Sequence, residues 1–342
     1  MCSPTLTTLP LLPMSIIVEC LDVESLLSLS QTAKVFKDFI KEVHLKSGGY
    51  YISIQRDHFN ISIKSRRYSY SYQAKKVKKD DFQLINNYLI NKFSADFKKH
   101  TDLLPGNIDY LLIDPVIASK FKNVMSCAIL SIGSIIPSSE FLESSLPDSV
   151  TFHKGLALNG VNVNNPDKIP KMWNIWNIDW LQIRNSSISI PLCQLNNKII
   201  NLWDISTITE PQINRYLQDL RDGVIDQPNL SFIQFRRQSG WNSQEILEGL
   251  GTVRCQKTKI YKLKDFDEKM RMDTFLPFGL NKNGIELSDT FDFVRRKDGV
   301  KCSIFLLSWV VRVYVWNQKE TTKRGRGHME DNDGGTAAKK SC

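Results

Sequence analysis

The sequence lacks the short motifs by which common nucleotide, hydrolase and zinc sites are found. The 342 residues contain no glycine-rich loop of the dinucleotide or Walker type and no Gly-x-Ser-x-Gly nucleophile elbow. They contain no Cys-x-x-Cys pair, and the five histidines are dispersed. We therefore expect no metal ion and no cofactor, and we interpret the chain as a binding protein rather than an enzyme.

The cysteines do not form the pattern of a disulfide framework. They are odd in number and far apart, at positions 2, 20, 127, 193, 255, 302 and 342. This distribution is typical of free thiols in a reducing compartment. Cys127 and Cys193 lie in apolar stretches, where we expect buried, packed thiols. A Cys–His nucleophile stays open as an alternative, since such a pair needs only to be close in space.

Long hydrophobic runs are also missing. The longest late run, residues 304–316, is interrupted by Arg312 and is too short to span a bilayer as a helix. The apolar N-terminus has no basic region and is broken by Pro4, Pro10 and Pro13, which argues against a signal peptide. We expect an intracellular protein of the cytoplasm, the nucleus or both, without a membrane partner.

The charge is positive but spread along the chain, at a formal +9. Its densest part runs from Lys64 to Lys79 and holds tyrosines at 68, 70 and 72 between two basic clusters. Tyrosines at this spacing suit base stacking, and they equally suit one face of a strand. We favour the strand and keep a nucleic-acid-binding stretch at 64–79 as the alternative.

Near the N-terminus, apolar spacing predicts three short helices. Pro13 and Ser15 suit a helix start, and Ile17 and Leu21 then share one face. Asp22 can cap a second helix that carries Leu26 and Leu29. A third helix is expected to begin at Ser30 or Thr32, with lysines 34, 37 and 41 outward and the apolar residues Val35, Phe36, Phe39 and Ile40 inward.

The stretch from Leu9 to Ile40 resembles an F-box, a helical module that docks on a Skp-type adaptor in cullin-RING ubiquitin ligases. The resemblance implies that Leu9, Pro10, Ile17, Leu21 and Leu26 lie at or just behind the adaptor-binding surface. The chain departs from the common pattern at Leu12, where an acidic residue is frequent, and at Phe36, where tryptophan is frequent. Ordinary core packing of three amphipathic helices is the competing interpretation.

Beyond Gly49 the pattern alternates between strand and helix. Strands are expected at 51–54, 59–63 and 68–72, a helix at 80–100, then strands at 110–113 and 128–132 around a helix near 117–121. Apolar segments follow at 156–161, 180–188, 200–205 and 230–235, with a helix from Ser206 to Gly223 before the last. The intervals of about 20 to 30 residues between successive apolar segments lie within the range of leucine-rich repeats. Stacked strand–helix units with parallel strands would give a curved sheet, and a conventional α/β domain is the alternative.

Two later segments resemble the F-box-associated domain (type 2) of nematode F-box proteins. One runs through Leu202–Ser206, Asn214–Leu217 and Asn229–Ile233, and the other through Asp292–Ile304. Independently of any family, Asp298-Gly299 predicts a tight hairpin turn between Phe291–Val294 and Val300–Leu306. Trp173, Trp176 and Trp180 are spaced as on one helix face, where core packing is the simpler alternative to a ligand-binding wall.

These observations together predict an α+β protein with four regions. They are a three-helix F-box at 8–46, linking strands and a helix at 47–100, a substrate-recognition region at 101–317, and a disordered tail at 318–342. The substrate region is expected to be a degenerate leucine-rich-repeat-like array closed by a hairpin, with the F-box-associated core at about 195–265. The resemblance implies an SCF-type ubiquitin ligase subunit that binds a Skp-type adaptor, a cullin through that adaptor, and a protein substrate. The sequence does not identify the residues that bind this substrate.

Overall fold

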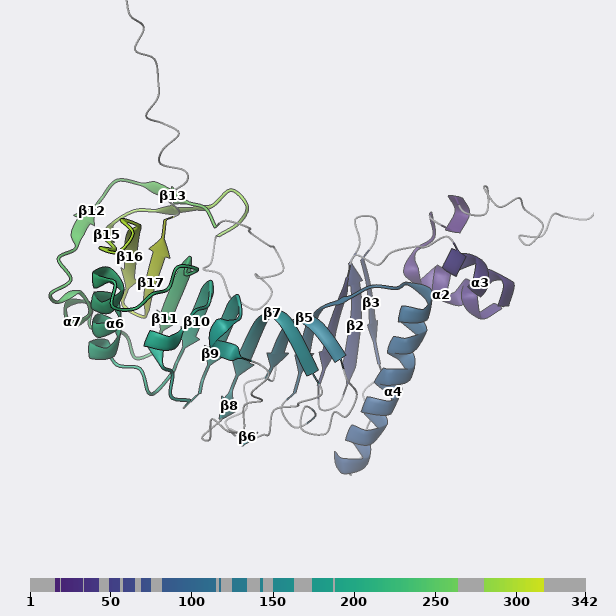
Figure 1. Ribbon diagram of the computed structural model, residues 1–342. Helices are drawn as coiled ribbons and strands as arrows, with labels where there is room; N and C mark the ends of the chain where they lie inside the picture. Colours follow the sequence, from purple (N-terminus) through teal and green to yellow (C-terminus); the bar gives the residue numbers. More distant parts are fainter. Residues whose placement is uncertain are drawn as a thin grey trace, which may run out of the picture.

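The computed structural model describes residues 16–18, 20–32, 34–42, 49–55, 58–64, 69–74, 82–114, 117, 125–133, 142–143, 150–162, 174–186, 188–263 and 280–316. Within these residues the architecture is α+β, and a thirteen-stranded mixed sheet forms its centre (Figure 1). The long axis of this sheet runs from the N-terminal helices at one end to the C-terminal hairpins at the other (Figure 1). No helix in the described ranges is both long and apolar enough to cross a membrane.

Parallel strands form the middle of the sheet, and neighbouring parallel strands follow one another in chain order. In the described residues they are β1 (Tyr50–Ile54), β4 (Ile108–Ile113), β5 (Met125–Ile132), β7 (Val150–Asn159), β9 (Trp180–Arg184), β10 (Ile199–Trp203) and β11 (Phe232–Arg236). Most of their residues are buried, as expected where both faces of a parallel sheet are covered.

Antiparallel strands extend the sheet at both ends. Beyond β1 lie β2 (Phe59–Lys64) and β3 (Ser69–Gln73). Beyond β11 lie β17 (Val310–Val315), β16 (Lys301–Leu307), β15 (Thr290–Val294) and β12 (Val253–Cys255). Two further pairs of described strands stand apart from this sheet, β13 (Lys259–Tyr261) with β14 (Ile285–Leu287) and β6 (Leu142–Glu143) with β8 (Val161–Asn162).

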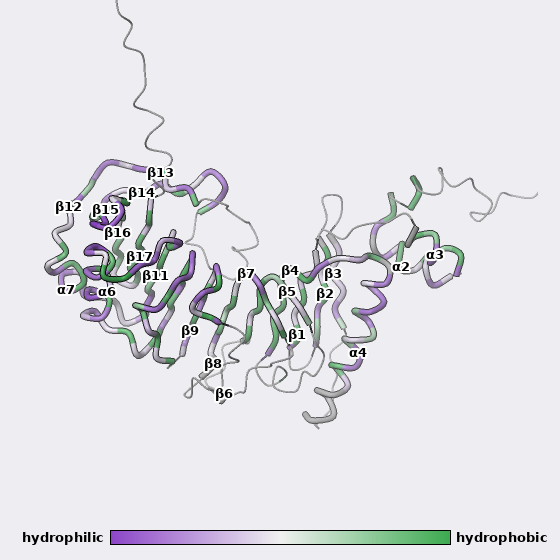
Figure 2. The backbone as a smooth tube through the Cα atoms, in the orientation of Figure 1, coloured by the Kyte–Doolittle hydropathy of each residue, from purple (hydrophilic) through white to green (hydrophobic). Residues whose placement is uncertain are grey.

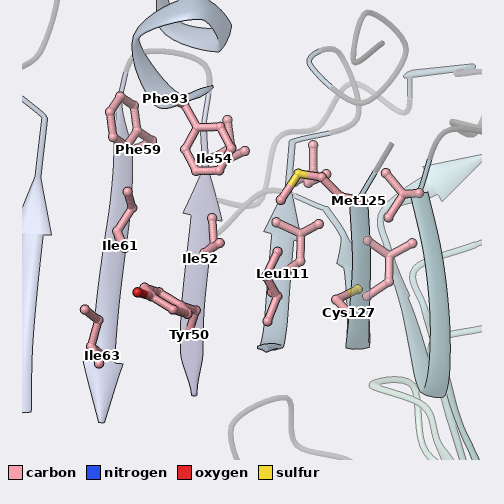
Figure 3. Close-up of a cluster of buried hydrophobic side chains, with 14 of the residues drawn as sticks. Tyr50, Ile52, Ile54, Phe59, Ile61, Ile63, Phe93, Leu111, Met125 and Cys127 are labelled. Atoms are coloured by element: carbon pink, nitrogen blue, oxygen red, sulfur yellow. The ribbon is translucent and has the colours of Figure 1, made fainter. Parts of the chain in front are cut away.

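At the β1 end, one face of the sheet is covered by α4 (Phe82–Leu103). Phe93 of this helix meets Phe59 of β2 edge-on, with ring centroids 5.5 Å apart, and Phe97 meets Tyr50 in the same way at 5.3 Å. Such edge-to-face pairs contribute about 0.5–1.5 kcal/mol each beyond the area they bury. Figure 3 shows the fully buried side chains of β1 and β2 on this face, namely Tyr50, Ile52, Ile54, Phe59, Ile61 and Ile63.

At the other end, the same face is covered by α6 (Glu210–Asp222) and α7 (Ser243–Leu247). The buried stripe of α6 is the predicted one, Ile213, Tyr216, Leu217 and Leu220, and the helix is capped by Gly223 with a φ of 76°. The Asn214 side chain donates to the carbonyl oxygens of Ile246 and Glu248 at 2.9 and 2.7 Å, which fixes α7 against α6. Asn214 thus links α6 to α7, whereas Leu217 packs in the core.

The second face of the sheet has its own smaller core. Trp180, Ile199, Phe232 and Tyr314 lie side by side on neighbouring strands and pack with Tyr261 and other residues beside β13 and β14. The Tyr261 hydroxyl donates to the Ser231 carbonyl oxygen at 2.6 Å. The small β13–β14 sheet is thereby anchored over the N-terminal ends of β10 and β11.

Most of the predicted elements are confirmed. The strands expected at 51–54, 59–63, 68–72, 110–113 and 128–132 and the helices expected at 80–100 and after Thr209 all occur, within a few residues at their ends. The hairpin around Asp298-Gly299 is also present, but a six-residue connection joins its strands, in which Arg295 and Asp298 form an ion pair. Of the helix expected near 117–121 only Ile117 is described, and the tail 318–342 lies outside the described residues.

The tryptophan spacing does not correspond to one helix face, and core packing, the simpler alternative, is confirmed for Trp180. Trp176 lies in the short 3-10 helix η4 (Ile175–Asn177) and Trp180 in β9, so they do not share a helix face. Trp173 lies outside the described residues. The apolar run 304–316 includes most of the predicted hairpin arm, which corresponds to β16, and continues into β17 after Ser308 and Trp309 turn the chain. At Trp180, pairing between distant strands overrides the local spacing.

Candidate functional site

The N-terminal helices place the predicted adaptor-binding residues at different depths. Ile17 and Leu21 are half-buried, and Leu26 is fully buried in the core. Leu26 therefore lies behind the surface rather than on it. Leu9 and Pro10, like the departure at Leu12, lie outside the described residues.

Two apolar side chains of these helices are turned outward. Ile16 is 56% exposed and Val35 is 58% exposed. The expectation that Val35 points inward is wrong, because the buried stripe of α3 (Lys34–Glu42) consists of Phe36, Phe39 and Ile40. Val35 precedes Phe36 by one position, which turns its side chain about 100° away around the helix.

The same helices are fixed to the sheet through α4. Val18, Leu26, Phe36, Phe39 and Ile40 belong to one buried cluster with the α4 and β1 residues described above. Asp22 caps α2 (Val23–Thr32) as expected, since its Oδ1 accepts a hydrogen bond from the Ser25 amide at 2.7 Å. This hydrogen bond lowers the pKa of the Asp22 carboxyl. The helical unit and the β1 end of the sheet therefore share one core.

Tyr70 and Tyr72 of the basic stretch pack against α4. Tyr72 donates to Asp96 of α4 at 3.0 Å, and its ring lies 5.6 Å from that of His100. The Tyr70 ring lies 5.9 Å from His100 as well. The strand interpretation is confirmed for these two tyrosines, both of which pack against His100 of α4. The lysines at 75, 76, 78 and 79 lie outside the described residues.

The cysteines show no activated thiol in the buried core. Burial raises the pKa of the Cys127 and Cys302 thiols to about 12, so both remain protonated at neutral pH. A protonated thiol is a poor nucleophile. The expectation for Cys193 is wrong, because this residue is exposed beside a cavity of about 390 Å³ that lies between α6 and residues 189–193. Among the described residues no group of His, Cys, Asp and Glu side chains could hold a metal ion.

A row of amide side chains crosses the second face of the sheet. Gln182 donates to Asn159 at 3.0 Å, Asn201 donates to Gln182 at 3.3 Å, and Gln234 donates to Asn201 at 2.9 Å. The row continues at both ends, where Asn159 donates to Ser131 and Arg312 donates to Gln234. We call these residues, Ser131, Asn159, Gln182, Asn201, Gln234 and Arg312, the amide ladder. Its central members are almost completely buried.

Next to the ladder, β9, β10 and β11 each end on a large half-exposed side chain. These residues, Arg184, Trp203 and Arg236, are directly paired across the strands. The Arg184 Cζ lies 3.8 Å and the Arg236 Cζ 3.6 Å from the centre of the Trp203 ring. Because β10 lies between β9 and β11, the two guanidinium groups approach Trp203 from opposite sides.

Trp309 extends this arrangement by one more ring, 4.6 Å from the Arg236 Cζ. Arg184, Trp203, Arg236 and Trp309 are called the arginine–tryptophan strip. Figure 2 shows the hydrophilic ends of β9, β10 and β11 where the strip lies, in contrast to the hydrophobic middle of the sheet.

The cations of the strip have unused donors. Neither Arg184 nor Arg236 makes a side-chain hydrogen bond or ion pair with any described residue, and the Arg184 Nε and Trp203 Nε1 atoms are buried without a partner. Burial lowers the pKa of Arg236, and the charges of Arg184 and Arg312 lower it further, while Asp204 opposes them. The neighbouring Arg237 differs, since it forms an ion pair with Glu210.

The strip was not predicted, although the sequence holds a signal for it. Leu181-Gln182-Ile183-Arg184, Ile200-Asn201-Leu202-Trp203 and Ile233-Gln234-Phe235-Arg236 share one pattern, an apolar residue, an amide, an apolar residue and then arginine or tryptophan. Only the strand register shows that the amides form one row and the terminal residues another. A four-residue pattern repeated at unequal intervals gives no such register by itself.

Comparison with protein-family models, with curated proteins and with solved structures finds no match for this chain. The function is therefore argued from the residues and their geometry.

Proposed function

We propose that the chain is a non-catalytic recognition subunit of an SCF-type ubiquitin ligase, with a Skp-type adaptor at its N-terminal helices and a protein substrate on its sheet. The observation that carries this proposal is the presence of two separate exposed surfaces of different chemistry. The outward-facing apolar residues Ile16 and Val35 lie near one end of the molecule, and the arginine–tryptophan strip lies nearer the other.

The apolar surface suits a protein partner. Ile16 and Val35 are more than half exposed and Ile17 is half-buried, so these helices present apolar side chains that a protein partner could cover. In the F-box interpretation, Leu26 and the other buried residues hold the helices in place, and Ile16 and Ile17 contact the adaptor. Val35 would extend this contact on α3.

The sheet suits the role of a substrate platform. In the described residues its parallel strands are added in chain order, as in a repeat protein whose units contact only their neighbours. We interpret it as a degenerate leucine-rich-repeat-like array, with the antiparallel strands β15, β16 and β17 closing one end. Such an array presents equivalent positions of successive strands side by side, which is how the strip arises.

The mechanism follows from the shared core of the two parts. Because the helices and the β1 end of the sheet are packed together, a bound adaptor and a bound substrate are held at a restricted separation. Tethering raises the effective concentration of substrate lysines near a conjugating enzyme carried by the ligase. The chain itself then needs no catalytic group.

The proposal is tested by capture of the purified full-length chain on immobilised Skp-type adaptors. The variant is Ile16→Asp/Ile17→Asp, since these side chains are at least partly exposed and Leu21 packs against the core. Burial of each isoleucine is worth about 1.5–3 kcal/mol, so their replacement predicts a loss of binding of more than about 100-fold.

The control is Val224→Asp, which places one aspartate on a 69% exposed apolar position directly after the α6 cap. We expect this control to bind the adaptor as the unmodified chain does. Equal binding of the double variant and the control, with native circular dichroism for both, would contradict an adaptor surface at Ile16 and Ile17. Failure of the unmodified chain to bind any adaptor would refute the proposed ligase role.

A further inference from the structure

The arginine–tryptophan strip has the geometry of a binding site for an anion. A guanidinium group stacked on an indole uses its face for the contact and leaves its N–H groups directed outward in its own plane. Arg184 and Arg236 are stacked on Trp203 in this way, and no described residue accepts a hydrogen bond from either side chain. Each arginine is therefore held beside the ring, and its side-chain donors have no acceptor among the described residues.

The side chains around the strip carry an excess of positive charge, which favours an anionic ligand. Arg312 lies on the same face, where its Nε donates to Gln234 at 2.7 Å, and its charge acts on Arg236. Asp204 is the acidic group that acts on Arg236, and its Oδ1 already accepts a hydrogen bond from the Gln238 amide. The cations thus outnumber the acidic group beside them.

A phosphate monoester fits these donors better than a carboxylate. It carries a charge of about −1.5 to −2 and three strongly accepting oxygens, so it can bond to two guanidinium groups at once. The two guanidinium groups lie over opposite faces of one tryptophan ring, so a phosphate between their outward N–H groups could bond to both.

A nucleic acid fits less well, although its phosphates carry the same charge. Binding of a single strand commonly combines phosphate contacts with bases stacked on aromatic rings. Both faces of Trp203 are already covered by guanidinium groups, so this ring is not open to a base. Trp309, which is 38% exposed, is the ring of the strip with free surface, and it suits an apolar side chain that flanks the phosphate.

We propose that the strip binds a phosphorylated side chain of a protein segment, with Arg184 and Arg236 as the phosphate ligands and Trp309 as an apolar contact. This inference rests on the proposed substrate-binding role and specifies its ligand. It does not involve the N-terminal helices, so adaptor binding and phosphate recognition can fail independently.

The test uses an array of degenerate peptides with phosphoserine at the centre, beside the same array with serine and with glutamate, probed with the full-length chain. A single-stranded oligouridylate of similar charge is measured in parallel by fluorescence anisotropy. The unmodified chain is expected to retain phosphoserine peptides selectively. Arg236→Gln should weaken binding to the best phosphopeptide by about 10- to 100-fold, as expected for the loss of charge-assisted hydrogen bonds.

Two control variants separate the strip from general charge. Arg215→Gln removes the same charge from an arginine of α6 whose side chain is 72% exposed on the other face of the sheet, and it should bind as the unmodified chain does. Arg236→Lys keeps the charge but not the planar donors, and it should recover only part of the affinity. Near-ultraviolet circular dichroism verifies that each variant is folded.

The outcomes decide the proposal. Selective phosphoserine binding that is lost in Arg236→Gln and kept in Arg215→Gln supports it. It is overturned if serine and phosphoserine peptides are retained equally, if no peptide is retained, if the two variants lose affinity alike, or if oligouridylate is the tighter ligand. If glutamate and phosphoserine peptides are retained equally, the strip recognises negative charge and not phosphate, and the proposal is overturned.

Discussion

The amide ladder predicts a large cost for the loss of one buried side chain. Asn201 is fully buried, donates to Gln182 at 3.3 Å and accepts from Gln234 at 2.9 Å. Asn201→Leu keeps the approximate volume and removes both hydrogen bonds. The Gln182 carbonyl oxygen and one Gln234 N–H then lose a partner inside the protein.

The magnitude follows from the cost of unsatisfied polar groups. Each buried donor or acceptor without a partner costs about 1–3 kcal/mol, so two of them predict a decrease in the free energy of unfolding of about 2–6 kcal/mol. The double variant Asn201→Leu/Gln234→Leu removes both partners of one bond. Its total cost should therefore fall short of the sum of the two single variants by about 1–2 kcal/mol.

The assay is urea denaturation followed by tryptophan fluorescence, with the slope of the transition compared between variants. Gln238→Leu, an exposed amide in the loop after β11, is the control and should change the free energy of unfolding by less than about 0.5 kcal/mol. If Asn201→Leu costs no more than this control, or if the costs of the two ladder variants add, the ladder is not a coupled network and the reasoning is refuted.

Three further predictions concern other parts of the chain. Burial acts to raise the pKa of Asp292, but hydrogen bonds from Lys259 and other side chains lower this pKa to about 2. The stability that the ionised carboxylate provides is therefore present above about pH 4 and is lost as the pH falls toward 2. Between about pH 4 and 2, the free energy of unfolding of Asp292→Asn should fall less steeply than that of the unmodified chain, and parallel curves would contradict this. Native alkylation at pH 8 followed by mass spectrometry should modify Cys193 and spare Cys127, since only the first thiol is exposed, and equal labelling would contradict the described core. Asn214→Ala should lower the free energy of unfolding by about 1–2 kcal/mol through its two lost hydrogen bonds, and an unchanged urea midpoint would show that α7 is held by other contacts.

The sequence predicts the elements of this fold where their period is strong. The stripe Ile213, Tyr216, Leu217 and Leu220 identifies α6 and its end at Gly223, because a 3.6-residue period and a following glycine act within one segment. The same holds for α4 and for the alternating strands β1 to β3. Each of these predictions depends on neighbours in the chain, and the structure confirms them.

Pairing between distant segments sets the limit of sequence-based prediction. Residues 304–316 form one apolar run in sequence, and only their contacts with β11 and β15 divide them into β16 and β17. The arginine–tryptophan strip depends still more on such contacts, since Arg184 and Arg236 meet Trp203 only because β9, β10 and β11 align in register. Side-chain orientation on a short helix is similarly sensitive, as Val35 shows.

The central claim, an adaptor surface at the N-terminal helices that is separate from the strip, is tested most directly by calorimetric titration of a Skp-type adaptor into three forms of the full-length chain. The account predicts equal, one-to-one binding by the unmodified chain and by Arg236→Gln, and no measurable binding by Ile16→Asp/Ile17→Asp. Absence of binding to the unmodified chain, or equal binding by all three forms, would contradict it.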